Sequence, residues 1–101
     1  MVEKTEDRKL IIKGRVDSIN AQTFEGELMA LCRSGEEVLI DASDLTYISS
    51  AGLRVFMRLK KAVKKDVIIE NVSNEVYDIF EVTGFTEILN IKKKIIQKLM
   101  N

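Results

Sequence analysis

With 101 residues, of which 46 % are hydrophobic and 32 % charged, the chain is long enough for one compact domain built on a single core. Its 16 basic and 16 acidic residues cancel, which removes the broad positive charge that draws proteins to nucleic acids or anionic membranes. One cysteine and no histidine exclude an internal disulfide and remove the commonest metal ligand and the commonest general base.

The first third of the chain predicts a hairpin followed by an amphipathic helix. Residues 9–13 are typical of a strand, and a weaker strand near residues 2–5 precedes them. Over residues 21–32 apolar side chains recur at helical spacing, Asn20 can cap the start of this helix, and Gly35 suits its end. We expect the apolar side of the helix to pack on a sheet.

The middle of the chain predicts a buried strand, a polar loop and a second helix. Residues 38–40 form a short continuous apolar run before Asp41, which is typical of a strand covered on both faces. A polar loop then leads into a helix from about residue 51 to 64, whose apolar face should also pack on the sheet. On a helical wheel, Leu53 and Met57 fall outside that buried face.

The last third predicts another central strand, another helix and an amphipathic end. Residues 67–69 form a further apolar run, Ser73 can cap the helix that follows, and Gly84 suits its end. Residues 88–89 predict a short edge strand. Over about residues 91–100, isoleucines and lysines recur at the spacing of a terminal amphipathic helix.

Helices that alternate with apolar strands predict the fold class. The pattern is typical of an α/β domain with a mixed central sheet of about four to five strands and about four helices. The sequence has no internal repeat, low-complexity stretch or linker, so residues 1–101 are expected to form a single domain.

The segment between residues 40 and 53 contains the candidate site. It runs from the end of a predicted central strand to a helix N-terminus, which is where α/β proteins often place their sites. Ser49 and Ser50 stand at the start of the helix, and Gly52 and Leu53 follow them. Taken alone, such a serine pair is most simply a helix cap and its neighbour.

Three stretches of the sequence resemble the anti-sigma factor antagonists of the STAS domain family. They are GRVD at residues 14–17, the segment 40–53 that ends in SSAGL, and FEVTGF at residues 80–85. Together they span nearly the whole chain in the family's order, which makes the signal specific. The resemblance implies a STAS-like domain that acts as a regulatory binding module and not as an enzyme.

The resemblance also implies how such a module is switched. In the family, the unphosphorylated protein binds an anti-sigma factor that is also a serine kinase, and this binding frees a sigma factor. Phosphorylation of the serine two positions before the glycine, here Ser50, ends the binding, and a PP2C-type phosphatase resets it. The family often has Asp at the preceding position, so Ser49 is a second candidate for the modification.

The partner-binding residues implied by this match lie on two segments of the chain. Asp17 and Ser18 match a loop that lies beside the phosphorylation site in the family, although from the sequence alone they are simply a turn and a cap. On the second segment the candidates are Ser49, Ser50, Gly52, Leu53, Arg54 and Met57.

Elementary physics predicts what each of these helix residues would do. If Ser50 caps a helix that begins at Ala51, the helix N–H groups and dipole would stabilise a phosphate there, and Arg54 could neutralise part of its charge. Leu53 and Met57 would give an apolar binding patch, unless a loop or the terminal helix covers them. Gly52 would allow close approach of the neighbouring strand or of the partner.

The remaining expectations concern location, assembly and ligands. The first ten residues are highly charged and no run is apolar enough to span a bilayer, so we expect a cytoplasmic protein with no membrane partner. We also expect no metal, no cofactor and no nucleic-acid partner, and a monomer or weak dimer. Cys32 shares the apolar side of its helix and is expected in the core.

Two other functions stay open at this point. An enzyme that uses Ser49 or Ser50 as nucleophile is disfavoured, because an activated serine needs a nearby base and the chain has no histidine. A non-catalytic STAS subunit of a transporter, for example in lipid transport, or of a larger signalling complex, is the alternative that the sequence cannot separate from the first hypothesis.

Overall fold

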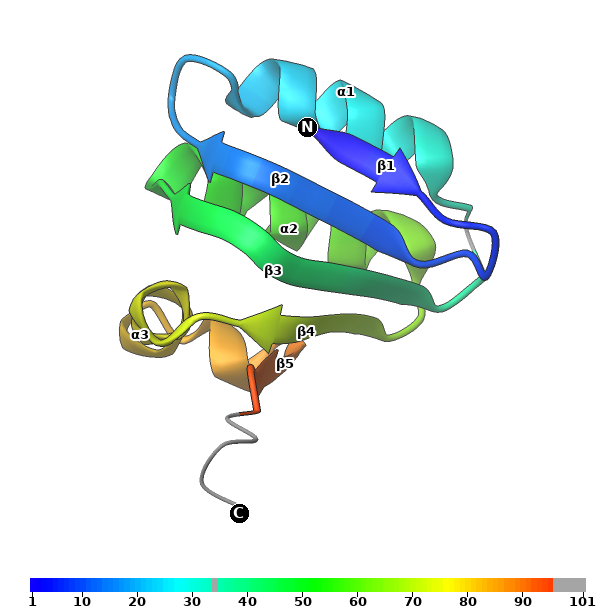
Figure 1. Ribbon diagram of the computed structural model, residues 1–101. Coiled ribbons are helices and arrows are strands. Elements are labelled where there is room, and N and C mark those ends of the chain that lie inside the picture. The colour runs from blue at the N-terminus through cyan, green and yellow to red at the C-terminus, as the bar shows by residue number, and fades with distance from the viewer. Residues whose placement is uncertain (34, 96–101) are drawn as a thin grey trace.

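One mixed sheet with three α-helices makes up the part of the chain that the computed structural model describes, residues 1–33 and 35–95 (Figure 1). The strands lie side by side in chain order: β1 (Val2–Lys4), β2 (Leu10–Val16), β3 (Val38–Ile48), β4 (Val67–Val72) and β5 (Asn90–Lys93). β1 runs antiparallel to β2, and all other neighbours are parallel. The predicted α/β fold with a mixed sheet and an opening hairpin is confirmed.

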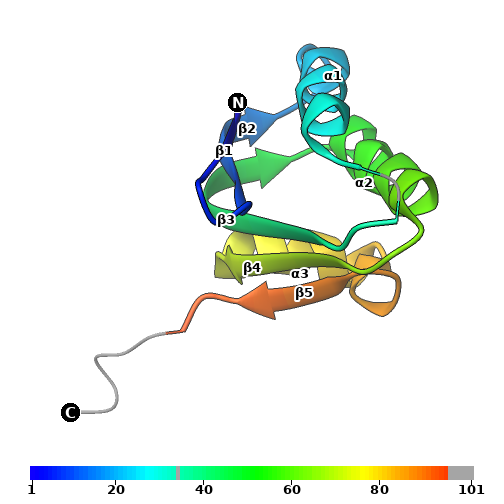
Figure 2. The ribbon, with the colours of Figure 1, turned by 90° about the vertical axis from the view of Figure 1, so that its right-hand side faces the viewer.

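The helices form one layer that is linked by aromatic rings. They are α1 (Ala21–Leu31), α2 (Ser50–Val63) and α3 (Asn74–Val82), followed by the short 3-10 helix η1 (Phe85–Glu87). Ring centroids of Phe24 and Phe56 are 5.7 Å apart, those of Phe56 and Phe80 5.9 Å, and those of Phe80 and Phe85 6.4 Å. Each of these contacts joins one helix to the next, and Figure 2 shows α1 and α2 side by side on one side of the sheet.

The sheet buries the face that these helices cover. Ile40 and Ile69 on neighbouring strands are fully buried, whereas the next residues along, Asp41 and Glu70, are only half-buried. This alternation places the core between one sheet face and the helix layer, because successive strand residues point to opposite faces. None of the helices in the described ranges is long and apolar enough to cross a membrane.

β3 is much longer than the predicted strand at residues 38–40, and the predicted polar loop after Asp41 is wrong. The strand continues to Ile48, and its pairing with β2 shifts register twice. These irregularities move the buried positions from a two-residue spacing, Val38 and Ile40, to a three-residue spacing, Leu45 and Ile48. Bulges that break the two-residue period make a strand look like a loop in the sequence.

The C-terminal end also differs from the prediction. β5 covers Asn90–Lys93 and pairs with β4, so the predicted terminal helix over residues 91–100 is wrong for its first three residues, and the strand expected at residues 88–89 begins later. Ile91 lies opposite Ile69 and packs against the core. Residues 96–100 of that predicted helix lie outside the described part of the chain. The described ranges therefore contain three α-helices instead of four.

Candidate functional site

The ends of β2 and β3 are joined where the two loops of the candidate site begin. The backbone N–H of Ser49 donates to the carbonyl oxygen of Val16 at 2.8 Å. This bond holds the turn between β3 and α2 next to the loop 17–20 that leaves β2. In Figure 1 both loops lie at the same end of the sheet, as the carboxyl ends of parallel neighbours must.

The two serines play different parts at the start of α2. Ser49 is the N-cap: its hydroxyl oxygen accepts from the Gly52 N–H at 3.3 Å, and its carbonyl accepts from the Leu53 N–H at 2.9 Å. Ser50 is the first residue of the helix, and its side chain is exposed. The prediction that Ser50 caps the helix is wrong by one position, because either hydroxyl suits a cap and only the turn geometry selects one. The Ser50 hydroxyl is left facing solvent.

Gly52 lets the first turn of α2 sit directly on the sheet. A Cβ atom at this position would lie 2.7 Å from Cγ1 of Ile48 and 2.8 Å from Cγ1 of Val16. Both distances are shorter than a carbon contact allows, so the helix could not stay in place with a larger residue. The sequence predicts that Gly52 allows close approach either of the neighbouring strand or of a partner, and the structure shows close approach of the strands.

The other predicted residues of α2 differ in exposure. Arg54 is exposed, Met57 is half-buried, and Leu53 is buried in the core with 5 % of its surface exposed. The helical wheel is therefore wrong in placing Leu53 outside the buried face, and of the two alternatives left open for this residue, the structure has the buried one. Because α2 contacts α1 as well as the sheet, its buried stripe is wider than packing on a sheet alone requires.

Asp17 organises the loop that faces the serines. Its Oδ1 accepts from the N–H groups of Ile19 at 2.9 Å and Asn20 at 3.0 Å, and its Oδ2 accepts from Nε of Arg15 at 3.2 Å. The bond from Asn20, followed by those from Ile19 and Arg15, holds the pKa of the Asp17 carboxyl below its usual value. The carboxylate is thus engaged within its own loop.

The side chain of Asn20 closes the same loop. It accepts from the Asp17 N–H at 2.9 Å and donates to the carbonyl of Arg15 at 2.9 Å. Asn20 occupies the N-cap position of α1, as predicted, yet it makes no side-chain capping bond to that helix. The loop is therefore braced by two side chains that bind backbone on either side of Ser18.

Two apolar or aromatic side chains at this end of the sheet were not predicted as site residues. Ile19 is 91 % exposed between the braced residues of the loop. Tyr47 on β3 is 40 % exposed, and the Arg15 guanidinium carbon lies 5.0 Å from its ring centroid. An isoleucine inside a capped turn, outside any helical or strand period, was the available signal for Ile19. The sequence gives no such signal for Tyr47, because the broken period of its strand predicts a loop.

Exposed polar, charged and apolar side chains stand on these two segments, which the bond between Ser49 and Val16 holds at the same end of the sheet. The loop presents Ser18 and Ile19, and α2 presents Ser50 and Arg54. Within residues 1–33 and 35–95, no three His, Cys, Asp or Glu side chains are grouped so that they could hold a metal ion. Such a mixture of exposed side chains suits contact with another macromolecule, and the exposed Ser50 stands at the first position of α2.

Comparisons with known proteins agree on one family. The family model of the STAS domain matches residues 1–97. An anti-sigma-B factor antagonist of Bacillus subtilis (strain 168) is 30 % identical over 95 residues, which cover 91 % of this chain and 87 % of the relative. The Bordetella bronchiseptica protein BtrV is 36 % identical over 84 residues, 79 % of this chain and 72 % of the relative. A crystal structure from Thermotoga maritima matches 99 % of this chain and 90 % of its own chain, with a TM-score of 0.70. At 17 % sequence identity, this match shows similarity of fold.

Proposed function

This chain belongs to the STAS domain family, and from that premise we propose that it is an anti-sigma factor antagonist controlled by phosphorylation of Ser50. In its unphosphorylated state it binds an anti-sigma factor serine kinase in the cytoplasm and so releases a sigma factor. The kinase supplies the chemistry, and this chain supplies the surface and the acceptor hydroxyl. The observation that carries the proposal is the exposed Ser50 side chain at the first position of α2.

A phosphate on Ser50 would leave the scaffold intact. The first N–H groups of a helix have no partner within the helix, and its N-terminus carries about half a positive charge. Arg54 lies four residues on, where side chains of a helix are neighbours. Both features favour a dianionic group at this position, and the Ser50 hydroxyl is not the N-cap that holds the helix start. Phosphorylation should therefore change the surface and not the fold.

The same phosphate would oppose docking of the partner. A phosphoserine carries roughly 1.5 to 2 negative charges at pH 7. Burying such a charge without full compensation costs several kcal/mol, enough to lower an affinity by orders of magnitude. A surface that binds its partner only while Ser50 is neutral is what partner switching requires, and a PP2C-type phosphatase would restore it.

We assign direct contacts with the partner to Ser18, Ile19, Ser50, Arg54 and Met57. Burial of an exposed isoleucine contributes about 1.5–3 kcal/mol, so Ile19 would be the main apolar anchor. The other four candidate residues hold this surface in position without contacting the partner. Asp17 shapes the loop and Ser49 caps α2, while Gly52 and Leu53 pack the helix against the core.

Phosphorylation by the kinase tests the site assignment. The purified chain, Ser49→Ala and Ser50→Ala are each incubated with the kinase and ATP, and the phosphorylated residue is identified by mass spectrometry. We expect phosphate on Ser50 in the native chain and in Ser49→Ala, and none in Ser50→Ala. Phosphate on Ser49 in the native chain would overturn the assignment. Capture of a transporter permease from native cells, in place of a kinase, would favour the transporter-subunit alternative.

A further inference from the structure

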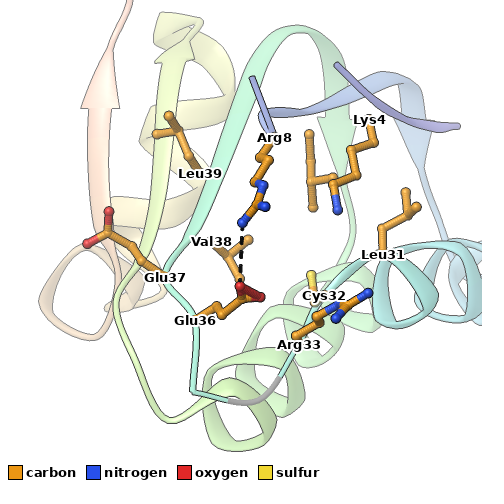
Figure 3. A pocket seen from close by; sticks show the side chains of 10 residues that line it. Lys4, Arg8, Leu31, Cys32, Arg33, Glu36, Glu37, Val38 and Leu39 are labelled. Atoms are coloured by element: carbon orange, nitrogen blue, oxygen red, sulfur yellow. Dashed lines mark ion pairs between the residues drawn. The ribbon is translucent and has the colours of Figure 1, made fainter. Parts of the chain in front are cut away.

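A hollow lies at the other end of β3, away from Ser50. It is bounded by the turn between β1 and β2, the end of α1 and the start of β3 (Figure 3). A smaller part of about 80 Å³ is lined by Leu10 and Cys32 among others, and a larger part has a volume of about 170 Å³. Lys4, Arg8 and Arg33 line both parts.

The charged side chains that line this hollow carry a net positive charge, although the net charge of the chain is zero. The larger part has three positive charges and one negative charge, or a net charge of +2, from Lys4, Arg8, Arg33 and Glu36; Glu37 lines only the smaller part. In Figure 3 the side chain of Glu37 points away from the three cations. The end of α1 adds only about half a negative charge, so it does not cancel the excess.

Much of this positive charge is available for a ligand. Across residues 1–33 and 35–95, neither Lys4 nor Arg33 takes part in an ion pair. Arg8 pairs with Glu36 at 3.6 Å, but their side chains are 79 % and 51 % exposed. An ion pair that is so exposed contributes little stability and can open at low cost. An anion of higher charge than the Glu36 carboxylate could therefore replace it as the partner of Arg8.

The turn that carries Arg8 is held in a fixed and unusual conformation. Arg8 has φ of 65°, a left-handed value that is unfavourable for a residue with a side chain. Thr5 holds the turn: its N–H donates to the Lys9 carbonyl at 2.8 Å, its carbonyl accepts from the Arg8 N–H at 3.1 Å, and its hydroxyl accepts from the Lys9 N–H at 3.1 Å. Despite its unfavourable φ, Arg8 is held in this turn, which places its guanidinium over the hollow (Figure 3).

We propose that this hollow binds a small phosphate-type dianion, held by Lys4 and Arg33 and by Arg8 after it exchanges Glu36 for the ligand. A net charge of +2 complements a dianion. A guanidinium group can donate two parallel hydrogen bonds to two oxygens of one phosphate, so it recognises the shape of the anion as well as its charge. Pockets for drug-sized ligands have volumes of about 300–1,000 Å³, so the available space favours a free ion over a nucleotide. The proposal is independent of any role of Ser50.

Titration of the full chain with inorganic phosphate, followed by amide NMR, tests the site. Chloride at matched ionic strength is the reference. We expect saturable shifts that are confined to Lys4, Arg8, Cys32, Arg33 and their neighbours. The double variant Lys4→Gln/Arg33→Gln should bind phosphate at least about tenfold more weakly, because each lost charge removes one charge-assisted contact.

A matched control removes the same charge elsewhere. Lys92 and Lys94 are exposed at the far edge of the sheet, so Lys92→Gln/Lys94→Gln should bind phosphate like the native chain. Cys32 gives a second readout because it is the only cysteine and burial raises the pKa of its thiol. Bound phosphate should slow its alkylation further in the native chain and in the control. Shifts that do not saturate, or equal binding by the Lys4/Arg33 variant, would overturn the proposal.

Discussion

The two ends of β3 present different kinds of surface on one scaffold. At the carboxyl end, Asp17 and Asn20 are bound to backbone within their loop, and the exposed side chains include two serines, Ser18 and Ser50, with Arg54 and the large apolar Ile19. At the amino end, Lys4 and Arg33 surround a hollow. A surface of well-held loops with an exposed apolar side chain suits a protein partner, whereas cations that line a small hollow suit an anion. This difference distinguishes the surface proposed as the switch from the hollow proposed as the anion site.

The largest change in stability is expected from Gly52→Ala. This variant tests whether close packing of α2 on β2 and β3 holds the site at the carboxyl end of β3 in place. The added Cβ would contact Ile48 and Val16 at distances that force the helix or strands to move. We expect a loss of about 1–3 kcal/mol in the free energy of unfolding, measured with urea. Gly26 in α1 has open space around it, so Gly26→Ala should be neutral or stabilising by up to about 1 kcal/mol. Equal effects of the two substitutions would contradict the packing argument.

Ile19→Ala should separate binding from stability. The side chain is 91 % exposed, so its loss should leave the unfolding free energy within about 0.5 kcal/mol of the native value. Affinity for the kinase partner should fall about tenfold, measured by isothermal titration calorimetry, because an apolar anchor is lost from the interface. Val82 is 82 % exposed on α3, and Val82→Ala serves as the control that leaves affinity unchanged. An unaltered affinity of Ile19→Ala would remove Ile19 from the proposed surface.

Ser49→Ala and Ser50→Ala should show that only Ser49 contributes to the stability of α2 as its cap. The first removes the N-cap hydroxyl of α2 and should lower the unfolding free energy by about 1 kcal/mol. The second removes an exposed hydroxyl at the first helical position and should cost less than about 0.5 kcal/mol. Thermal unfolding of both variants checks this order, and the reverse order would show that Ser50 is the cap.

The smallest effect concerns the pH dependence of the loop 17–20. Hydrogen bonds hold the pKa of Asp17 below its ordinary value of 3.8, so the loop is stabilised above that pH and loses this stabilisation as the pH falls through the lowered pKa. Amide NMR of Ile19 and Asn20 should therefore show a titration whose midpoint lies below 3.8. In Asp17→Asn this titration should disappear. A midpoint above the ordinary value would contradict the geometry of the loop.

The sequence was sufficient for the order of the elements and for the segment of the site, because hydrophobic periods and caps such as Ser73 are local signals. It could not predict that β3 reaches Ile48, since two shifts of register break the strand period. Nor could it choose between two serines that cap equally well, or predict that Leu53 of α2 is buried in the core. The exposure of Ile19 depends on how Asp17 and Asn20 fold the loop, which only the three-dimensional contacts reveal.

The most direct test compares the affinity of the kinase partner for the unphosphorylated chain and for the chain phosphorylated on Ser50, together with the unfolding curve of each form. We expect phosphorylation to lower the affinity at least about 100-fold, equivalent to about 2.7 kcal/mol, while the unfolding free energy stays within about 1 kcal/mol of the unphosphorylated value. Equal affinities of the two forms, or a phosphorylated chain that no longer folds, would contradict a switch that acts through the surface alone.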